Sequence, residues 1–133
     1  MKLKFTASAV MAAALTLTAC ATSPTGRKQV LLYSESQLAQ MGDQAFTGMK
    51  EELKISNKAV QNSYVECVAN AITAQVPASV FNGQWEVVVF DDEQVNAFAL
   101  PGGKIGVYTG LLKVAENQHQ LAAVIGHEVG HVI

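Results

Sequence analysis

The sequence contains few of the features that would place it in several large classes of protein. It has 9 basic and 11 acidic residues among 133, so it lacks the basic excess of nucleic-acid-binding proteins, and we expect no nucleic-acid partner. It has only two cysteines, so at most one disulfide can form. It also lacks an uninterrupted apolar run of about 20 residues, an internal repeat and a low-complexity tract. These absences leave one small globular domain, or part of a larger one, as the expected class.

The first twenty residues have the pattern of a bacterial lipoprotein signal peptide. A short basic start precedes an apolar, Ala-rich run, and Leu17-Thr18-Ala19-Cys20 matches the lipobox. We therefore expect a signal peptide over residues 1–19, lipidation of Cys20 and a tether over residues 20–33. An ordinary signal peptide followed by an unrelated cysteine is the alternative. Ala21 favours a lipid-anchored location in the bacterial cell envelope, on the outer membrane and facing the periplasm.

The second cysteine has two possible states. If Cys20 is lipidated, Cys67 is unpaired, and its place on an apolar helical face predicts a buried, inert thiol. A disulfide between Cys20 and Cys67 is the competing possibility, because an oxidising compartment favours it.

The strongest chemical signal is His127-Glu128-Val129-Gly130-His131, which fits the pattern His-Glu-x-x-His. On a helix, residues i and i+4 share a face, so the two imidazoles can converge on one metal ion. Glu128 lies about 100° around the helix from His127, where it can take a proton from a metal-bound water. The sequence therefore predicts His127 and His131 as zinc ligands and Glu128 as the catalytic base.

The pattern of the same segment argues against the alternative that the two histidines are ordinary surface groups. Apolar residues form one stripe on the helical wheel, and His127 and His131 face almost the other way. The stripe consists of Leu121, Ala122, Val124, Ile125, Val129 and Val132. Gly126 and Gly130 suggest close approach by another backbone, since each costs the helix about 1 kcal/mol relative to alanine. His119, two turns from His127, is expected to be exposed.

The segments between the two ends predict an α+β domain. Helices are expected over residues 34–53, with Ser34 and Gln37 as a capping box, and from Ser56 or Asn57 to a point before Pro77. The second helix is expected to bury Val60, Tyr64, Val68, Ala71 and Ile72. Strands are expected over residues 85–90, 95–100 and 104–108, with the apolar run 87–90 suggesting a buried strand and residues 101–103 a hairpin turn. Asn117 and Gln120 are expected to cap the last helix.

Three stretches of the sequence resemble a known family. They are Asn-Ala-Phe-Ala-Leu-Pro-Gly-Gly at 96–103, Ile-x-Val-Tyr-Thr-Gly-Leu-Leu at 105–112, and the segment 122–132 around the two histidines. Together they resemble the HtpX/CAAX-prenyl-protease family of zinc endopeptidases, and with the lipobox its periplasmic lipoprotein branch, which is LoiP-like and BepA-like. The resemblance implies a zincin-like (minigluzincin) fold, with residues 34–133 forming its N-terminal part, and one Zn²⁺ per complete site.

The resemblance also implies a substrate and a third ligand. Asn96, Ala97, Phe98 and Ala99, with the strand over 104–108, would border a cleft in which a peptide adds as an extra strand. The substrates would be misfolded or unfolded proteins, hydrolysed in quality control of the envelope. The third zinc ligand would be a Glu on a helix downstream of the second histidine. The 133-residue chain ends before such a helix, so we expect this chain by itself to be inactive.

Two functions without catalysis stay open on the sequence alone. One is an envelope lipoprotein that binds partner proteins through an exposed sheet edge, and the other is a weak metal-binding fragment without partners. Proteolysis that depends on Glu128 would separate the peptidase from both.

Overall fold

A computed structural model describes residues 20–133, and the chain divides into two compact units after Ser34. In the first unit, β1 (Cys20–Thr22) pairs antiparallel with β2 (Lys28–Val30), so the segment expected to be a tether contains a two-stranded hairpin. The predicted signal peptide over residues 1–19 lies outside the described residues, and so does the side chain of Cys20. Within the described part of the chain, no helix combines the length and apolar character needed to cross a membrane.

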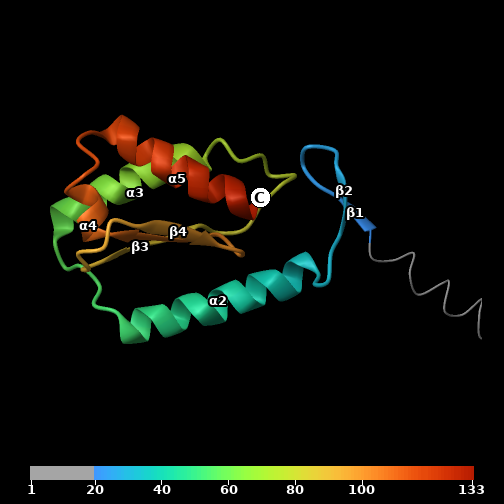
Figure 1. Ribbon diagram of the computed structural model, residues 1–133, viewed down its shortest axis with the longest axis horizontal. Helices are drawn as coiled ribbons and strands as arrows, with labels where there is room; N and C mark the ends of the chain where they lie inside the picture. The colour runs from blue at the N-terminus through green and yellow to red at the C-terminus, as the bar shows by residue number, and fades with distance from the viewer. Residues whose placement is uncertain (1–19) are drawn as a thin grey trace, which may run out of the picture. The chain divides into compact units, whose positions relative to one another are not determined.

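The second unit is built of helices on both faces of a small sheet (Figure 1). Its elements in chain order are α2 (Glu35–Glu52), α3 (Ala59–Thr73), β3 (Glu86–Phe90), β4 (Ala97–Leu100), β5 (Lys104–Tyr108), α4 (Thr109–Leu112) and α5 (Gln118–Val132). Helix α2 covers one face of the sheet, and α3 and α5 cover the other. The predicted α+β class is confirmed, and each predicted helix and strand is present within a few residues of its expected bounds.

The sheet has the strand order β3-β5-β4, so the last strand in sequence is the central one. β5 pairs parallel with β3 and antiparallel with β4. The predicted turn after β4 is confirmed, because Gly102 and Gly103 have φ of 87° and 76°, a region that glycine adopts without steric cost. The apolar run over residues 87–90 predicts a buried strand, and Val89 and Phe90 are buried. Both of its faces are covered, but β3 lies at an edge and Val87 and Val88 are half-buried.

The alternation of side chains along the strands divides the core into two clusters. Val87 and Val89 pack with residues of α3 and α5, whereas Val88 and Phe90 pack on the side of α2. The second cluster is aromatic, and its ring pairs have centroids 5.9–6.2 Å apart. It consists of Phe46, Phe90, Phe98 and Tyr108.

The prediction of the buried face of helix α3 is correct only in part: Val68 is buried and Ile72 packs against the core, but Val60, Tyr64 and Ala71 are exposed. The exposed fraction of Val60 is 84% and that of Tyr64 is 36%, while Val65 and Ala69 are fully buried. Cys67 is exposed with a free thiol, so the prediction of a buried thiol is wrong. The reason is that small apolar residues line more than one side of this helix, and periodicity alone cannot tell which side meets the sheet.

Helix α3 also begins later than predicted, because the segment before it pairs with β3. The Ser56 backbone amide donates to the Val89 carbonyl at 2.8 Å, and the Asp91 amide donates to the Lys54 carbonyl at 2.7 Å. Ile55 thus forms an antiparallel bridge with Phe90. The bridge holds residues 54–56 extended and so keeps them out of the helix, which starts at Ala59.

Helix α2 approaches the sheet most closely at Gly42. This glycine is buried, and a Cβ built on it would lie 2.0 Å from the Pro101 carbonyl oxygen. The absence of a side chain therefore lets the helix backbone rest on the turn between β4 and β5. At Gly48, in the second half of the same helix, an added Cβ would meet nothing within 4 Å.

An ionic network joins α2 to the start of the sheet. Glu86 accepts from Lys50 at 2.5 Å and from Lys104 at 2.9 Å, and Lys104 lies 3.3 Å from Asp43. The hydrogen bond from Lys50, followed by that from Lys104, lowers the pKa of Glu86 below its ordinary value of 4.5. The hydrogen bond with Glu86 raises the pKa of Lys104. Helix α2 is therefore held at Gly42 by close packing, at Phe46 by the aromatic cluster and here by charge.

Two alanine substitutions in α2 should have opposite effects on stability. Gly42→Ala should destabilise the protein, because the new methyl group meets backbone that has to move, and overpacking of this kind costs about 1–3 kcal/mol. Gly48→Ala should stabilise it by up to about 1 kcal/mol, because only the helix propensity changes. Urea unfolding of the two variants measures both. Equal effects would show that α2 does not rest on Pro101.

The stability contributed by Glu86 should depend on pH. Since its pKa is lower in the folded state, the contribution is present above pH 4.5 and is lost as the pH falls through the lower, folded value. Glu86→Gln should therefore lower the free energy of unfolding at pH 7, and its difference from the wild type should shrink at acid pH. Denaturant unfolding at pH 7 and pH 3 tests this, with the exposed Glu52→Gln as the matched control. A difference that persists unchanged at pH 3 would contradict the ionic assignment.

Candidate metal centre

Helix α5 carries the predicted metal ligands and begins at the predicted cap. The Asn117 side chain accepts from the backbone amides of His119 and Gln120 at 3.0 and 3.1 Å. The Gln120 side chain accepts from the amide of Glu116 at 2.8 Å, one residue before the position expected for a capping box. His119 is exposed in the first turn, as predicted.

The apolar stripe of α5 is buried and turns the two histidines outward. Leu121, Ile125 and Val129 are at most 3% exposed, whereas His127 and His131 are exposed. Glu128, the predicted base, is half-buried. The helix packs against α3 and β4 (Figure 1), so the core fixes the face that carries the histidines.

The two glycines of α5 do not mark a close backbone approach, so that prediction is wrong. A Cβ on Gly126 would meet only the Ile72 side chain, at 3.9 Å, and one on Gly130 would meet nothing within 4 Å. The glycines are compatible with the helix, but packing among the described residues does not require them.

The two imidazoles converge on a single point. The Nε2 atoms of His127 and His131 are 3.0 Å apart, and the ring planes are nearly perpendicular at 88°. Two nitrogens bound tetrahedrally to one zinc ion at about 2.0–2.1 Å would lie about 3.3–3.4 Å apart. A side-chain movement of a few tenths of an ångström would therefore let the pair share one metal, so the donor set fits the group.

Residues 20–133 contain no third side chain that completes the site. No group of three or more His, Cys, Asp or Glu side chains in this range could hold a metal ion. Several upstream glutamates have other surroundings: Glu86 is paired with two lysines, Glu93 is 2.7 Å from Lys113, and Glu66 lines a hollow beside β3. A Glu ligand downstream of His131 stays a prediction of the resemblance.

Of the predicted substrate residues, Ala97, Phe98 and Ala99 lie on β4 and Asn96 directly precedes it. The outer edge of β4 is unpaired among the described strands. The Tyr108 amide donates to the Asn96 carbonyl at 3.0 Å, so the backbone of Asn96 faces β5. By alternation, the N–H and C=O groups of Ala97 and Ala99 point away from the sheet. The Phe98 side chain packs in the aromatic cluster on the side of α2. The strand β5, also expected to border the cleft, is hydrogen-bonded on both sides and offers no free backbone.

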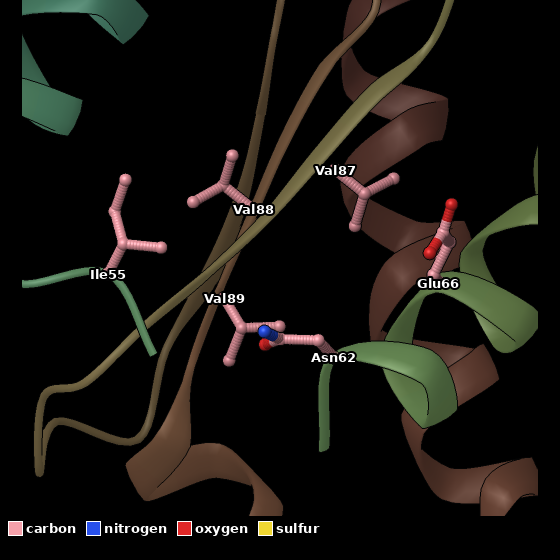
Figure 2. A pocket seen from close by; sticks show the side chains of 6 residues that line it. All are labelled: Ile55, Asn62, Glu66, Val87, Val88 and Val89. Atoms are coloured by element: carbon pink, nitrogen blue, oxygen red, sulfur yellow. The ribbon is translucent and has the colours of Figure 1, made fainter. Parts of the chain in front are cut away.

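Sequence reasoning missed a second feature, a hollow of about 150 Å³ at the opposite edge of the sheet (Figure 2). It is lined by Ile55, Asn62, Glu66, Val87, Val88 and Val89. These residues come from three segments that only the fold brings together. No periodicity or short motif in the sequence could have identified them.

Comparison with known proteins identifies a family. Peptidase family M48 matches residues 57–133. The mitochondrial metalloendopeptidase OMA1 of Arabidopsis thaliana is 38% identical over 103 residues, which cover 74% of this chain and 20% of that protein. The mitochondrial metalloendopeptidase OMA1 of Danio rerio is 33% identical over 114 residues, 82% of this chain and 24% of that protein. The beta-barrel assembly-enhancing protease of Escherichia coli is 25% identical over 99 residues, 74% of this chain and 20% of that protein. The chain thus spans about a fifth to a quarter of these relatives.

The predicted location is wrong. The sequence predicted a lipid-anchored protein of the bacterial envelope, on the outer membrane and facing the periplasm. The relatives from Arabidopsis thaliana and Danio rerio are mitochondrial by name, and the bacterial relative is less similar. The prediction depended on residues 1–20, where a basic start without acidic residues is a signal that secretory and mitochondrial targeting segments share.

Loss of the Asn117 cap should loosen the helix that carries the histidines. Asn117→Ala removes the acceptor for two backbone amides and should lower the free energy of unfolding by about 1 kcal/mol. His119→Ala, an exposed change in the same turn, serves as the control and should have little effect. Thermal and denaturant unfolding measure both. An unchanged stability in Asn117→Ala would show that the core alone determines where α5 begins.

Proposed function

Because the chain belongs to peptidase family M48, whose members are metal-dependent peptidases, we propose that it forms part of a zinc-dependent metalloendopeptidase acting on unfolded or misfolded proteins. The observation that carries the proposal is the convergence of the His127 and His131 Nε2 atoms at 3.0 Å, with Glu128 beside them on the same helix. The α+β architecture and the Asn-Ala-Phe-Ala strand support a zincin-like (minigluzincin) fold of the HtpX/CAAX-prenyl-protease branch.

The two histidines and Glu128 have different roles in the proposed reaction. His127 and His131 hold the metal through Nε2. When bound, zinc supplies Lewis-acid polarisation of the scissile carbonyl and increases the acidity of a water molecule. A Glu128 carboxylate oxygen takes the proton of the attacking water and delivers it to the nitrogen of the departing amine.

A complete site requires one more protein ligand, since catalytic zinc takes three together with water. We propose a Glu downstream of His131 in that role, as the family resemblance implies. The fit of the two-histidine donor set supports this arrangement, and the described residues provide no competing third ligand.

The outer edge of β4 is suited to hold the substrate in extended form. Ala97 and Ala99 present backbone donors and acceptors that no described strand pairs with, and α5 packs against the same strand. A peptide that adds as a strand would bond mainly through its own backbone, which gives little sequence preference. Such binding suits unfolded chains, because folded proteins rarely offer an unpaired extended segment.

The same free edge supports the second candidate function, partner binding without catalysis. Binding through Ala97 and Ala99 uses only backbone groups and does not require the metal. It should therefore survive His127→Ala, whereas proteolysis should not.

The first step is to sequence the gene through and beyond codon 133 and to express the protein that the complete reading frame encodes. The test is whether this protein hydrolyses casein. Glu128→Gln should lower kcat/KM by about 10²- to 10⁴-fold, because a general base is lost, while bound zinc is unchanged. His127→Ala and His131→Ala should lose the zinc as well. Glu116→Gln, an exposed change just before α5, is the matched control and should leave activity unchanged.

Metal content by elemental analysis and cleavage by gel assay provide the two readouts. Failure of the zinc-loaded, full-length protein to cleave any unfolded substrate would exclude the peptidase. Full activity in Glu128→Gln would exclude this base.

A further inference from the structure

The outer edge of β3, on the far side of β5 from the candidate substrate strand, is only partly paired. Residues 54–56 lie antiparallel to its C-terminal end through the two backbone hydrogen bonds at Val89 and Asp91. After Ser56 the chain leaves the sheet to begin α3. Among the described residues, no segment pairs with the rest of this edge.

The unpaired part of the edge presents backbone donors and acceptors. The Glu86 amide donates to the Gly103 carbonyl at 2.8 Å, so the backbone of Glu86 faces the sheet. Backbone groups alternate in direction along a strand, and Val87 therefore points its N–H and C=O outward. Val89 points outward too, but its carbonyl accepts from Ser56, so the position opposite Val89 is already occupied and Val87 is the open one.

The hollow of about 150 Å³ follows this edge on both faces of the strand. In Figure 2, Val88 and Ile55 point to one side of β3, and Val87 and Val89 point to the other, toward α3. The core contacts agree, because Val88 packs in the cluster of α2 and Val89 in the cluster of α3. A hollow that wraps a strand edge suits a second extended strand, whose side chains alternate between the same two faces.

The α3 side of the hollow contains two oxygen acceptors. The Asn62 Nδ2 donates to the Ser56 carbonyl at 3.0 Å, which fixes the orientation of the amide. Its Oδ1 is buried and has no hydrogen-bond partner among the described residues. Glu66, one turn further along α3, adds an exposed carboxylate to the lining. A buried acceptor beside a carboxylate is complementary to a cationic donor.

We propose that the outer edge of β3 binds an extended, basic peptide segment of another polypeptide. The segment continues the antiparallel pairing beyond Ser56 and bonds to the outward N–H and C=O of Val87. Its residue opposite Val87 lies on the α3 face of the sheet and carries a Lys or Arg side chain to Asn62 Oδ1 and Glu66. This docking edge is separated from β4 by β5, so it does not depend on the proposed catalysis.

The first experiment measures amide hydrogen exchange in the 133-residue protein by NMR. The probe is a blocked seven-residue peptide in which Arg alternates with Val and Thr. Its binding should slow exchange of the Val87 amide at least tenfold and leave those of Ala97 and Ala99 unchanged. The same peptide with N-methylated backbone amides on its pairing side should not bind. Protection confined to Ala97 and Ala99, or none at either edge, overturns the proposal.

The second experiment tests the recognition of charge by titration. Glu66→Gln should weaken binding of the Arg peptide about tenfold, and the exposed Glu52→Gln, the matched control, should not change it. A peptide with norleucine in place of Arg should bind wild type more weakly and should be insensitive to Glu66→Gln. Because Glu66 is exposed, the variant is expected to fold, and its NMR spectrum verifies this. Equal affinity of wild type for the two peptides overturns the basic specificity.

Discussion

The structure depends on β5 being paired on both sides. This strand joins β3 and β4 into one sheet, and its buried residues contact both layers of helices. The register of β5 with β4 is set by the lack of a side chain at Gly106, which lies opposite Phe98. A Cβ on Gly106 would lie 2.2 Å from the Phe98 ring, so the ring can cross β5 only at this glycine. A slip of one residue would place a side chain under the ring and would move every neighbouring side chain to the opposite face. The two edges of the sheet, and the helices that lie along them, follow from this pairing.

The candidate metal centre depends on the same core, although its ligands are exposed. A helix of 15 residues is marginal in water, so α5 needs tertiary contacts to stay folded. Burial of Leu121, Ile125 and Val129 supplies about 1.5–3 kcal/mol for each side chain. These residues also set the rotation of the helix about its axis, and with it the direction of His127 and His131. The short distance between the two Nε2 atoms is therefore a consequence of packing on the opposite side of the helix.

The features that the sequence predicts correctly are local. The cap at Asn117, the turn after β4 and the spacing of His127 and His131 each depend on a few neighbouring residues, whose chemistry allows few conformations. The errors concern choices between surfaces. Helix α3 has apolar residues on several sides, and the sheet, not the helix, decides that Val65 is buried and Cys67 exposed. The central place of β5 was equally unpredictable, because strand order depends on contacts between segments that are distant in sequence.

Among the described residues, the outer edge of β4 is unpaired and that of β3 is only partly paired. Open strand edges ordinarily favour association between copies, and the fold limits this differently at each edge. β4 has only four residues, so it offers few backbone groups to a neighbour. β3 is longer, but residues 54–56 occupy one end, and the ionic network of Glu86 marks the other. What remains open at β3 is a short stretch between these two, lined by groups that prefer a cation. The open part of the β3 edge is short and lies beside a carboxylate, so binding there would depend on the partner's side chains. Binding to the backbone groups of Ala97 and Ala99 would not. The two proposals together would give the sheet one permissive edge beside the helix of the candidate metal centre and one selective edge on its far side.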